Sequence, residues 1–146
     1  MSTFEPLHDA EQKWLAEQIN ASFQFAGVSA AENECAPNLE LLDVAFAHFL
    51  NRVQDAEEAN RVLTLVGVAF GAHLVSRLGF EWGYATDDWG AGLAVRARPG
   101  RGDVTIFPID FVSKRYENRD TPFLVGSLGA IEESLRKIDR EWESKP

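Results

Sequence analysis

Apolar side chains recur every three or four residues in the first half of the chain, which predicts helices before any strand. The first predicted helix starts at Asp9 as its N-cap and runs to about Phe23. Its apolar face consists of Trp14, Leu15, Ile19 and Phe23, all of which we expect to be buried. A second helix follows Asn38, which is a typical N-cap residue. Its apolar positions are Leu39, Leu42, Phe46 and Phe49.

A third helix is predicted from about Ala56 to Leu78, and Gly79 ends it. Two glycines, Gly67 and Gly71, lie four residues apart inside this helix and therefore share one face. Each of them costs roughly 1 kcal/mol of helix propensity. We therefore expect another element to pack closely against the glycine-bearing face.

The pattern changes to alternation after Gly79. Three short runs alternate between apolar and other residues, and turn residues separate them: 80–85, 93–98 and 104–107. This two-residue period predicts a three-stranded antiparallel meander. Between the second and third runs, Pro99 and Gly100 suit the two central positions of a type II turn.

The last part of the chain returns to helical spacing. Pro108 ends the third strand and opens a short helix, "PIDFVSKRYEN". Asp120 is the expected N-cap of a final helix with Pro122 at its first position. Two further glycines, Gly126 and Gly129, are expected to delay the start of this helix to near Ser127.

These elements predict one α+β domain over residues 1–146, with a three-stranded meander packed against helices in the order ααα-βββ-αα. It would comprise an acidic helical part (1–58), a helix-meander-helix core (60–120) and an amphipathic C-terminal helix (121–146). The length of 146 residues is typical of a single domain.

The net charge of −9 is concentrated in one part of the chain. Residues 1–60 carry eleven acidic residues against Lys13 and Arg52, whereas residues 61–146 carry twelve of each sign. So acidic a protein repels phosphate backbones, which argues against nucleic acid as a partner. The acidic charge either simply keeps the protein soluble or attracts a basic protein partner. In the second case, the expected docking surface consists of Glu32, Glu34, Glu40 and Asp43.

Other sequence features bear on location and cofactors. The longest apolar stretch, 62–76, is shorter than the roughly 20 residues of a membrane span. The chain starts without a cationic, apolar leader, and its single cysteine, Cys35, permits no internal disulfide. The three histidines show no zinc-binding spacing. We expect a cytoplasmic protein without a membrane, metal or cofactor.

Adjacent carboxylates at Asp87 and Asp88 offer two interpretations. They could act as paired acid and base, but neighbours in a turn usually point apart, and Asp-Asp-x-Gly is typical of a hairpin. We favour the turn, with one carboxylate capping it and pairing with Lys114 or Arg115. The neighbouring hairpin carries Arg96 and Arg98 on one strand face, extended by Arg101. These arginines either hold an anion or discourage edge pairing, and we favour the second interpretation.

Three stretches carry a family resemblance: "LVGVAFGAHLVSRLGFEW", "DDWG" and "VTIFPIDFVSKRYEN". Together they resemble a small bacterial domain family of unknown function over about residues 60–120. The matching positions are Gly67, Gly71, Gly79, Trp82, Asp87 or Asp88, Gly90, Pro108, Lys114 and Arg115. The resemblance implies an α+β fold and no assigned activity.

Two functions remain open from the sequence. We favour a non-catalytic protein-binding module that docks a basic partner, as an immunity protein that neutralises a toxin does. The alternative is a small-molecule enzyme or ligand binder that uses Asp87, Asp88 and the three arginines. A deep polar pocket at those side chains would favour the alternative, and a flat acidic surface would favour the module.

Overall fold

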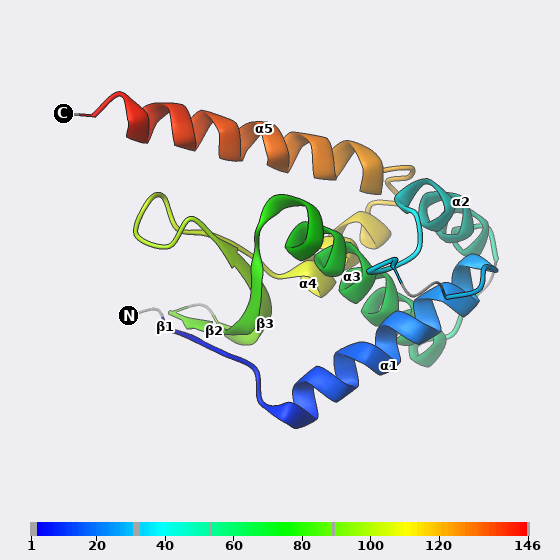
Figure 1. The fold of residues 1–146 in the computed structure, drawn as a ribbon. Coiled ribbons are helices and arrows are strands. Elements are labelled where there is room, and N and C mark those ends of the chain that lie inside the picture. Colours follow the sequence, from blue (N-terminus) through cyan, green and yellow to red (C-terminus); the bar gives the residue numbers. More distant parts are fainter. Residues whose placement is uncertain (1–2, 31–32, 53, 89, 146) are drawn as a thin grey trace.

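The computed structural model describes residues 3–30, 33–52, 54–88 and 90–145, and in these it confirms an α+β fold (Figure 1). The elements follow the order β-ααα-βββ-αα. The strands are β1 (Thr3–Glu5), β2 (Glu81–Asp87), β3 (Gly90–Ala97) and β4 (Val104–Ile106). The helices are α1 (Asp9–Ala26), α2 (Leu39–Leu50), α3 (Ala56–Leu78), α4 (Pro108–Glu117) and α5 (Leu124–Glu143).

The sheet has one strand more than the predicted meander. Its four strands are antiparallel in the order β1-β2-β3-β4, so β1 extends the meander at the β2 edge. Phe4 lies opposite Ala85 in this pairing. A segment of three residues is too short to show a two-residue period, and its partner lies some eighty positions away. The pairing is therefore a tertiary feature that the local pattern did not predict.

Capping residues explain why the predicted limits of α3 and the start of α2 are correct. The Asp55 carboxylate accepts a hydrogen bond from the Glu58 amide at 2.7 Å, and Gly79 ends α3 with a φ of +76°. At α2, the Asn38 side chain accepts one from the Glu40 amide at 2.8 Å. Each capping residue is adjacent to the helix end that it defines, so the sequence pattern alone was sufficient to predict these helix limits.

The predictions for α1 were wrong in three respects. Its N-cap is His8 rather than Asp9, and the helix continues to Ala26 before Gly27 ends it with a φ of +75°. Trp14 was expected in the core, but 36% of it is exposed. The indole lies at a shallow cleft beside Tyr84 and Leu93, at a margin of the sheet where other elements cover it only in part.

The core is built around α3, which is buried along most of its length from Ala59 to Leu74. The predicted close approach at its glycines is confirmed. A Cβ on Gly67 would lie 2.6 Å from the Ile109 Cα, and one on Gly71 would lie 2.8 Å from Trp82 Cζ2 and 3.0 Å from Pro108 Cγ. Gly67 therefore lets the backbone of α4 approach α3, and Gly71 leaves room for the side chains of Trp82 and Pro108.

α3 also meets the length and hydropathy criteria for a membrane-spanning helix, although the apolar stretch was judged too short from sequence. Of its most apolar window, 67% is buried inside the protein. Burial of this extent is typical of a helix in the core of a folded domain.

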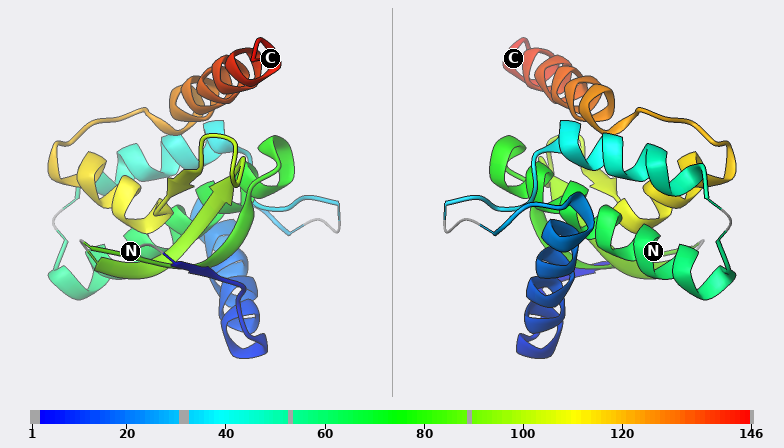
Figure 2. Two further views of the ribbon diagram at one scale, coloured as in Figure 1. Left: turned by 90° about the vertical axis from the view of Figure 1, so that its left-hand side faces the viewer. Right: turned by 90° about the vertical axis from the view of Figure 1, so that its right-hand side faces the viewer.

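The two faces of the sheet have different surroundings. The inner face carries Trp82 and Val95 and packs toward α3, where Val95 is fully buried. The outer face carries Phe4, Gly83, Ala94 and Arg96, because Gly83 pairs with Ala94, Phe4 pairs with Ala85 two positions from Gly83, and Arg96 lies two positions from Ala94. Figure 2 (left) shows the sheet in front of the helices, with no described helix crossing the outer face.

Candidate functional site

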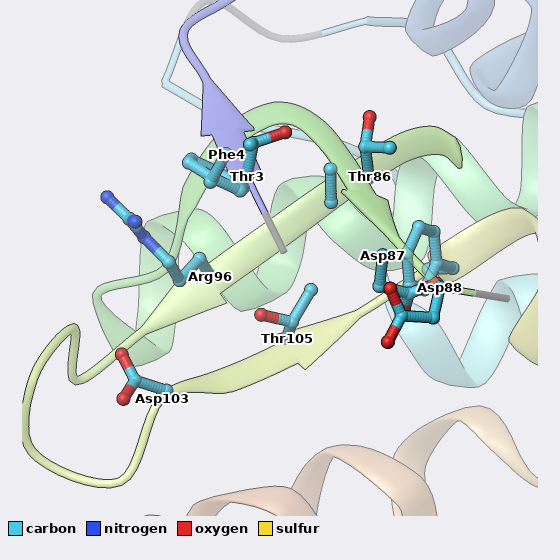
Figure 3. A pocket seen from close by; sticks show the side chains of 10 residues that line it. Thr3, Phe4, Thr86, Asp87, Asp88, Arg96, Asp103 and Thr105 are labelled. Carbon is cyan, nitrogen blue, oxygen red and sulfur yellow. The ribbon is translucent and has the colours of Figure 1, made fainter. Parts of the chain in front are cut away.

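The outer face of the sheet is hollowed by a cavity of about 730 Å³ (Figure 3). This volume is in the range of ligand-binding pockets. The described residues that line it come from all four strands and the adjoining turns: Thr3, Phe4, Ala85, Thr86, Asp87, Asp88, Arg96, Asp103, Thr105 and Phe107. We refer to this cavity as the outer-face groove.

Small residues form the floor of the outer-face groove. Gly83 lies opposite Ala94 and Ala85 lies opposite Gly92, so β2 and β3 contribute no long side chains to the centre of the outer face. The Phe4 ring covers Gly83, and Ala94 is fully buried, so Ala85 is the one of these four residues that lines the cavity. Phe4 on β1 and Phe107 after β4 are larger groups on either side. A Cβ on Gly92 would lie 3.7 Å from the Phe107 ring, which is an ordinary contact. The hollow is thus a direct consequence of residue size on one face of two strands.

A stack of three residues closes one end of the groove. The Phe4 ring lies over Gly83, where a Cβ would collide with it and would also lie 2.7 Å from the Glu5 carbonyl oxygen. The Arg96 guanidinium carbon lies 4.1 Å from the centroid of the Phe4 ring, and Nη2 donates to Glu81 Oε1 at 2.7 Å. The Nε atom of Arg96 is buried without a hydrogen-bond partner in the structure.

Carboxylates lie at both ends of the groove. In Figure 3, Asp87 and Asp88 are at one end, Asp103 is near Arg96 at the other, and Thr105 lies between them. Asp87 Oδ1 accepts a hydrogen bond from the Gly90 amide at 3.0 Å, which confirms that this residue caps the turn. Asp103 Oδ1 accepts one from the Gly100 amide at 2.7 Å. The turns therefore orient these carboxylates.

The basic residues proposed to pair with the hairpin have partners on α4. Lys114 Nζ lies 3.1 Å from Asp110 Oδ2, one turn earlier in the same helix. The Arg115 guanidinium lies 4.0 Å from the centroid of the Phe111 ring. These contacts are local to α4, as helical i,i+4 spacing favours.

The three predicted arginines do not form a cluster. β3 ends at Ala97, and Arg98 adopts a φ of +56°, which takes it out of the alternation that places Arg96 on the outer face. Arg98 Nε and Nη2 instead donate to Asp139 Oδ1 and Oδ2 on α5 at 2.7 and 3.0 Å. The hydrogen bond from Arg98 lowers the pKa of the Asp139 carboxyl. Only Arg96 lines the groove, and Arg101 is exposed in the turn.

The turn itself has the predicted geometry. The Arg101 amide donates to the Arg98 carbonyl at 2.9 Å, and Gly100 has a φ of +73°. Pro99 and Gly100 are therefore the central residues of a type II turn.

The acidic docking surface expected from the sequence is only partly exposed. Glu34 and Glu40 are exposed, and Glu32 lies outside the described residues. Asp43 is only 6% exposed, and its carboxylate accepts hydrogen bonds from the amides of Phe123, Leu124 and Val125. The prediction that Asp43 belongs to an exposed surface was wrong, because its carboxylate serves the start of α5.

The histidines lie away from the groove. His73 is buried, with Nε2 at 2.7 Å from the Pro37 carbonyl oxygen and Nδ1 at 3.8 Å from Cys35 Sγ. A carbonyl only accepts hydrogen bonds, so Nε2 donates and Nδ1 faces the thiol as an acceptor. Burial lowers the pKa of His73. Among the described residues, no group of three or more histidine, cysteine or acidic side chains could hold a metal ion.

Carboxylates dominate the charged lining of the groove. Its described lining contains three carboxylates and one arginine but no histidine, cysteine or lysine. Asp87 and Asp103 already bond to backbone amides of their own turns, which is a structural role. Sequence reasoning identified Asp87, Asp88 and Arg96, but it missed Phe4, Asp103, Thr105 and Phe107, which strand pairing brings beside them.

Comparison with known proteins gives one match. Residues 44–126 match the model of a family described as "Domain of unknown function (DUF3806)". The matched segment contains all of residues 60–120, over which the sequence resembles a family of unknown function, and confirms that resemblance. No curated protein and no solved structure matches the chain significantly.

Proposed function

The chain belongs to the DUF3806 family of domains of unknown function, and we propose that it is a non-catalytic module that docks a basic segment of a partner protein in the outer-face groove. The observation that carries this proposal is the hollow, uncovered sheet face lined by an excess of carboxylates. Neutralisation of a toxin by an immunity-type protein is one form that such docking takes.

Charge supports a basic occupant. Asp87, Asp88 and Asp103 line the groove, and the charge of Arg96 is offset by Glu81 at 2.7 Å. The described lining thus holds three carboxylates and one arginine, in a protein with a net charge of −9. A cationic segment would therefore approach with a favourable long-range field, which salt would weaken.

The dimensions support an extended segment. Along β2, Asp87 lies six positions after Glu81, which pairs with Arg96 at the opposite end. A strand rises about 3.3 Å per residue, so the groove spans roughly 20 Å, or about six residues of extended chain.

Two observations favour a second candidate, a small-molecule enzyme or ligand binder: the cavity of about 730 Å³ that is lined by Asp87, Asp88 and Arg96, which is the feature expected of that candidate, and an unsatisfied donor at one end of it. The buried Nε of Arg96 has no hydrogen-bond partner in the structure, and buried donors are usually satisfied. A carboxylate or carbonyl oxygen at that end of the groove would satisfy it. A backbone carbonyl of a docked protein segment would satisfy the same atom. The unsatisfied donor therefore does not distinguish a protein segment from a small ligand, and the two candidates differ in the size of the occupant.

Site-specific cross-linking tests the proposal. A photoreactive amino acid replaces Thr105 at the groove wall, and in a control it replaces Ala130, which is exposed on α5. In cells that express the protein, we expect the photoreactive group at Thr105 to cross-link to a protein segment rich in lysine or arginine. The group at Ala130 should give no such cross-link. The yield should fall as the salt concentration rises in extracts.

A steric plug provides the matched variant. The Cβ of Gly92→Leu would meet only ordinary contacts with Phe107. The rest of the side chain adds bulk to the outer face, so the variant should abolish the cross-link, and circular dichroism shows whether the fold is retained. Gly129→Leu adds the same side chain on α5, where nothing lies within 4 Å, and should leave the cross-link intact. Cross-linking that persists in Gly92→Leu, or an acidic cross-linked segment, would contradict the proposal. A small molecule retained by the purified parent and lost from Gly92→Leu would instead establish the second candidate.

A further inference from the structure

The outward side of α2 carries apolar residues that the fold leaves exposed. Val44 is 56% exposed and Leu41 is 44% exposed, although both lie on a helix whose other face is in the core. Beside them is a cavity of about 410 Å³ between α2 and the end of α1, lined in part by Phe25, Ala45 and Phe49. A partly apolar hollow next to protruding apolar side chains is typical of an interaction surface.

The charges along this side of α2 are ordered. Glu40, Val44 and His48 are four residues apart on α2, and Arg52 follows directly after the C-cap of the helix, Asn51. We call these four exposed residues the α2 ridge. The Glu40 carboxylate belongs to the first turn of α2, whereas Arg52 lies beyond its last turn and lines the same hollow as Val44 and His48. Arg52 Nη2 lies 2.9 Å from Glu58 Oε1, yet 60% of the arginine side chain is exposed.

Because the acidic and basic groups lie at opposite ends of the α2 ridge, two copies of the ridge that run antiparallel place opposite charges next to each other. If two copies of α2 lie antiparallel about a two-fold axis near residue 46, Glu40 of each copy lies opposite Arg52 of the other. Val44 of each copy then lies opposite His48 of the other, next to the hollow lined by Phe25 and Ala45. A two-fold interface requires this self-complementarity.

We propose that the occupant of the α2 ridge is a second copy of this chain, so that the protein forms a two-fold dimer through antiparallel α2 helices. The basic group that Glu40 meets is then Arg52 of the other copy. This interface is separate from the outer-face groove, and neither proposal depends on the other.

Sedimentation equilibrium of the full chain tests the dimer. We expect a mass of twice 16.3 kDa at high protein concentration. Val44→Glu should raise the dissociation constant by at least about 100-fold, because it places a carboxylate without a partner in the centre of the interface. Trp142→Glu, which makes a comparable change at a 37% exposed position on α5, should leave the constant unchanged. A parent that stays monomeric, or a Val44→Glu variant that dimerises like the parent, overturns the proposal.

A charge exchange tests the antiparallel pairing. Glu40→Arg alone and Arg52→Glu alone should each weaken the dimer, because each places like charges opposite one another. The double variant restores opposite charges at both contacts and should recover most of the affinity. If each single variant weakens the dimer and the double variant does not recover, the pairing of Glu40 with Arg52 is wrong. Circular dichroism of all three variants shows whether the fold is retained.

Discussion

Asp43 is a residue of α2 that serves the start of another helix. α5 begins at Leu124, and its own N-cap residue, Phe123, offers no side-chain hydrogen bond. The Asp43 carboxylate takes that role and bonds to three successive backbone amides, from Phe123 to Val125. The sequence had indicated Asp120 as the cap and a start near Ser127, and both predictions were wrong. A cap supplied from eighty residues away leaves no local signal.

We expect Asp43→Ala to lower the free energy of unfolding by about 2–3 kcal/mol, because buried amides lose their acceptor. Asp43→Asn keeps an acceptor oxygen and should cost less, about 1 kcal/mol. Urea unfolding measures both. Asp120→Ala is the matched control, since this exposed aspartate should contribute less than about 0.5 kcal/mol. Equal losses at the two positions would show that the buried carboxylate is not the cap.

His73 couples the stability of the protein to pH. Burial lowers the pKa of the imidazole below 6.5, more strongly than its hydrogen bond to Pro37 raises that pKa. The unfolded chain then binds more protons than the folded one as the pH falls through about 6.5. The stabilisation is therefore complete above this pH and decreases below it, by at most about 1.4 kcal/mol per pH unit for one group.

We expect His73→Gln to remove this component of the pH dependence. Between about pH 7.5 and about pH 5.5, the free energy of unfolding of the parent should fall further than that of the variant. Urea titrations at the two pH values measure the difference. His8 and His48 remain in both proteins, so their contributions cancel. If parent and variant lose the same stability, His73 does not titrate differently in the folded and unfolded states.

At the scale of elements, the position of α3 depends on its two interior glycines. Gly71 faces Trp82 and Pro108, and Gly67 faces the backbone of Ile109 at the start of α4. All three neighbours come from segments that follow α3 in the chain. The close approach of α4 and of Trp82 to α3 at these two positions therefore requires a helix surface without side chains there.

We expect Gly71→Leu to destabilise the protein by about 3 kcal/mol or more, because Trp82 and Pro108 would both have to move. Gly129→Ala on α5 is the matched control. Nothing lies within 4 Å of a Cβ at that position, so the better helix former should stabilise the protein by about 0.5–1 kcal/mol. Urea unfolding of both variants gives the two changes. A Gly71→Leu variant as stable as the parent would contradict the close packing of α3.

At the scale of the whole molecule, the helices pack behind and beside one face of the sheet and leave the other face uncovered (Figure 2). The uncovered face has a floor of small residues and an excess of carboxylates, whereas the exposed apolar side chains of α2 lie on a different part of the surface. The chain thus presents two distinct surfaces, one suited to a basic segment and one suited to a second copy. Separate variants, Gly92→Leu and Val44→Glu, address them independently.

Part of the candidate site could be predicted because its signals are local. Asp87 and Gly90 were identified as turn residues from their types and spacing, and the structure confirms the capping hydrogen bond. The prediction of an arginine cluster was wrong because Arg98 has a left-handed backbone conformation and its side chain bonds to α5. Phe4 was missed because its strand is short and pairs with a distant one.

The sequence by itself determined the elements whose signals lie within a few residues of one another. These are the amphipathic faces and caps of α2 and α3, the alternation of β2 and β3, and the type II turn at Pro99 and Gly100. Only the tertiary structure decided which distant groups meet: β1 with β2, Asp43 with the start of α5, Arg98 with Asp139, and the side chains around the outer-face groove. The physical reason is that capping and periodicity act over one or two turns of chain. Long-range hydrogen bonds and packing depend instead on how the completed elements fit together.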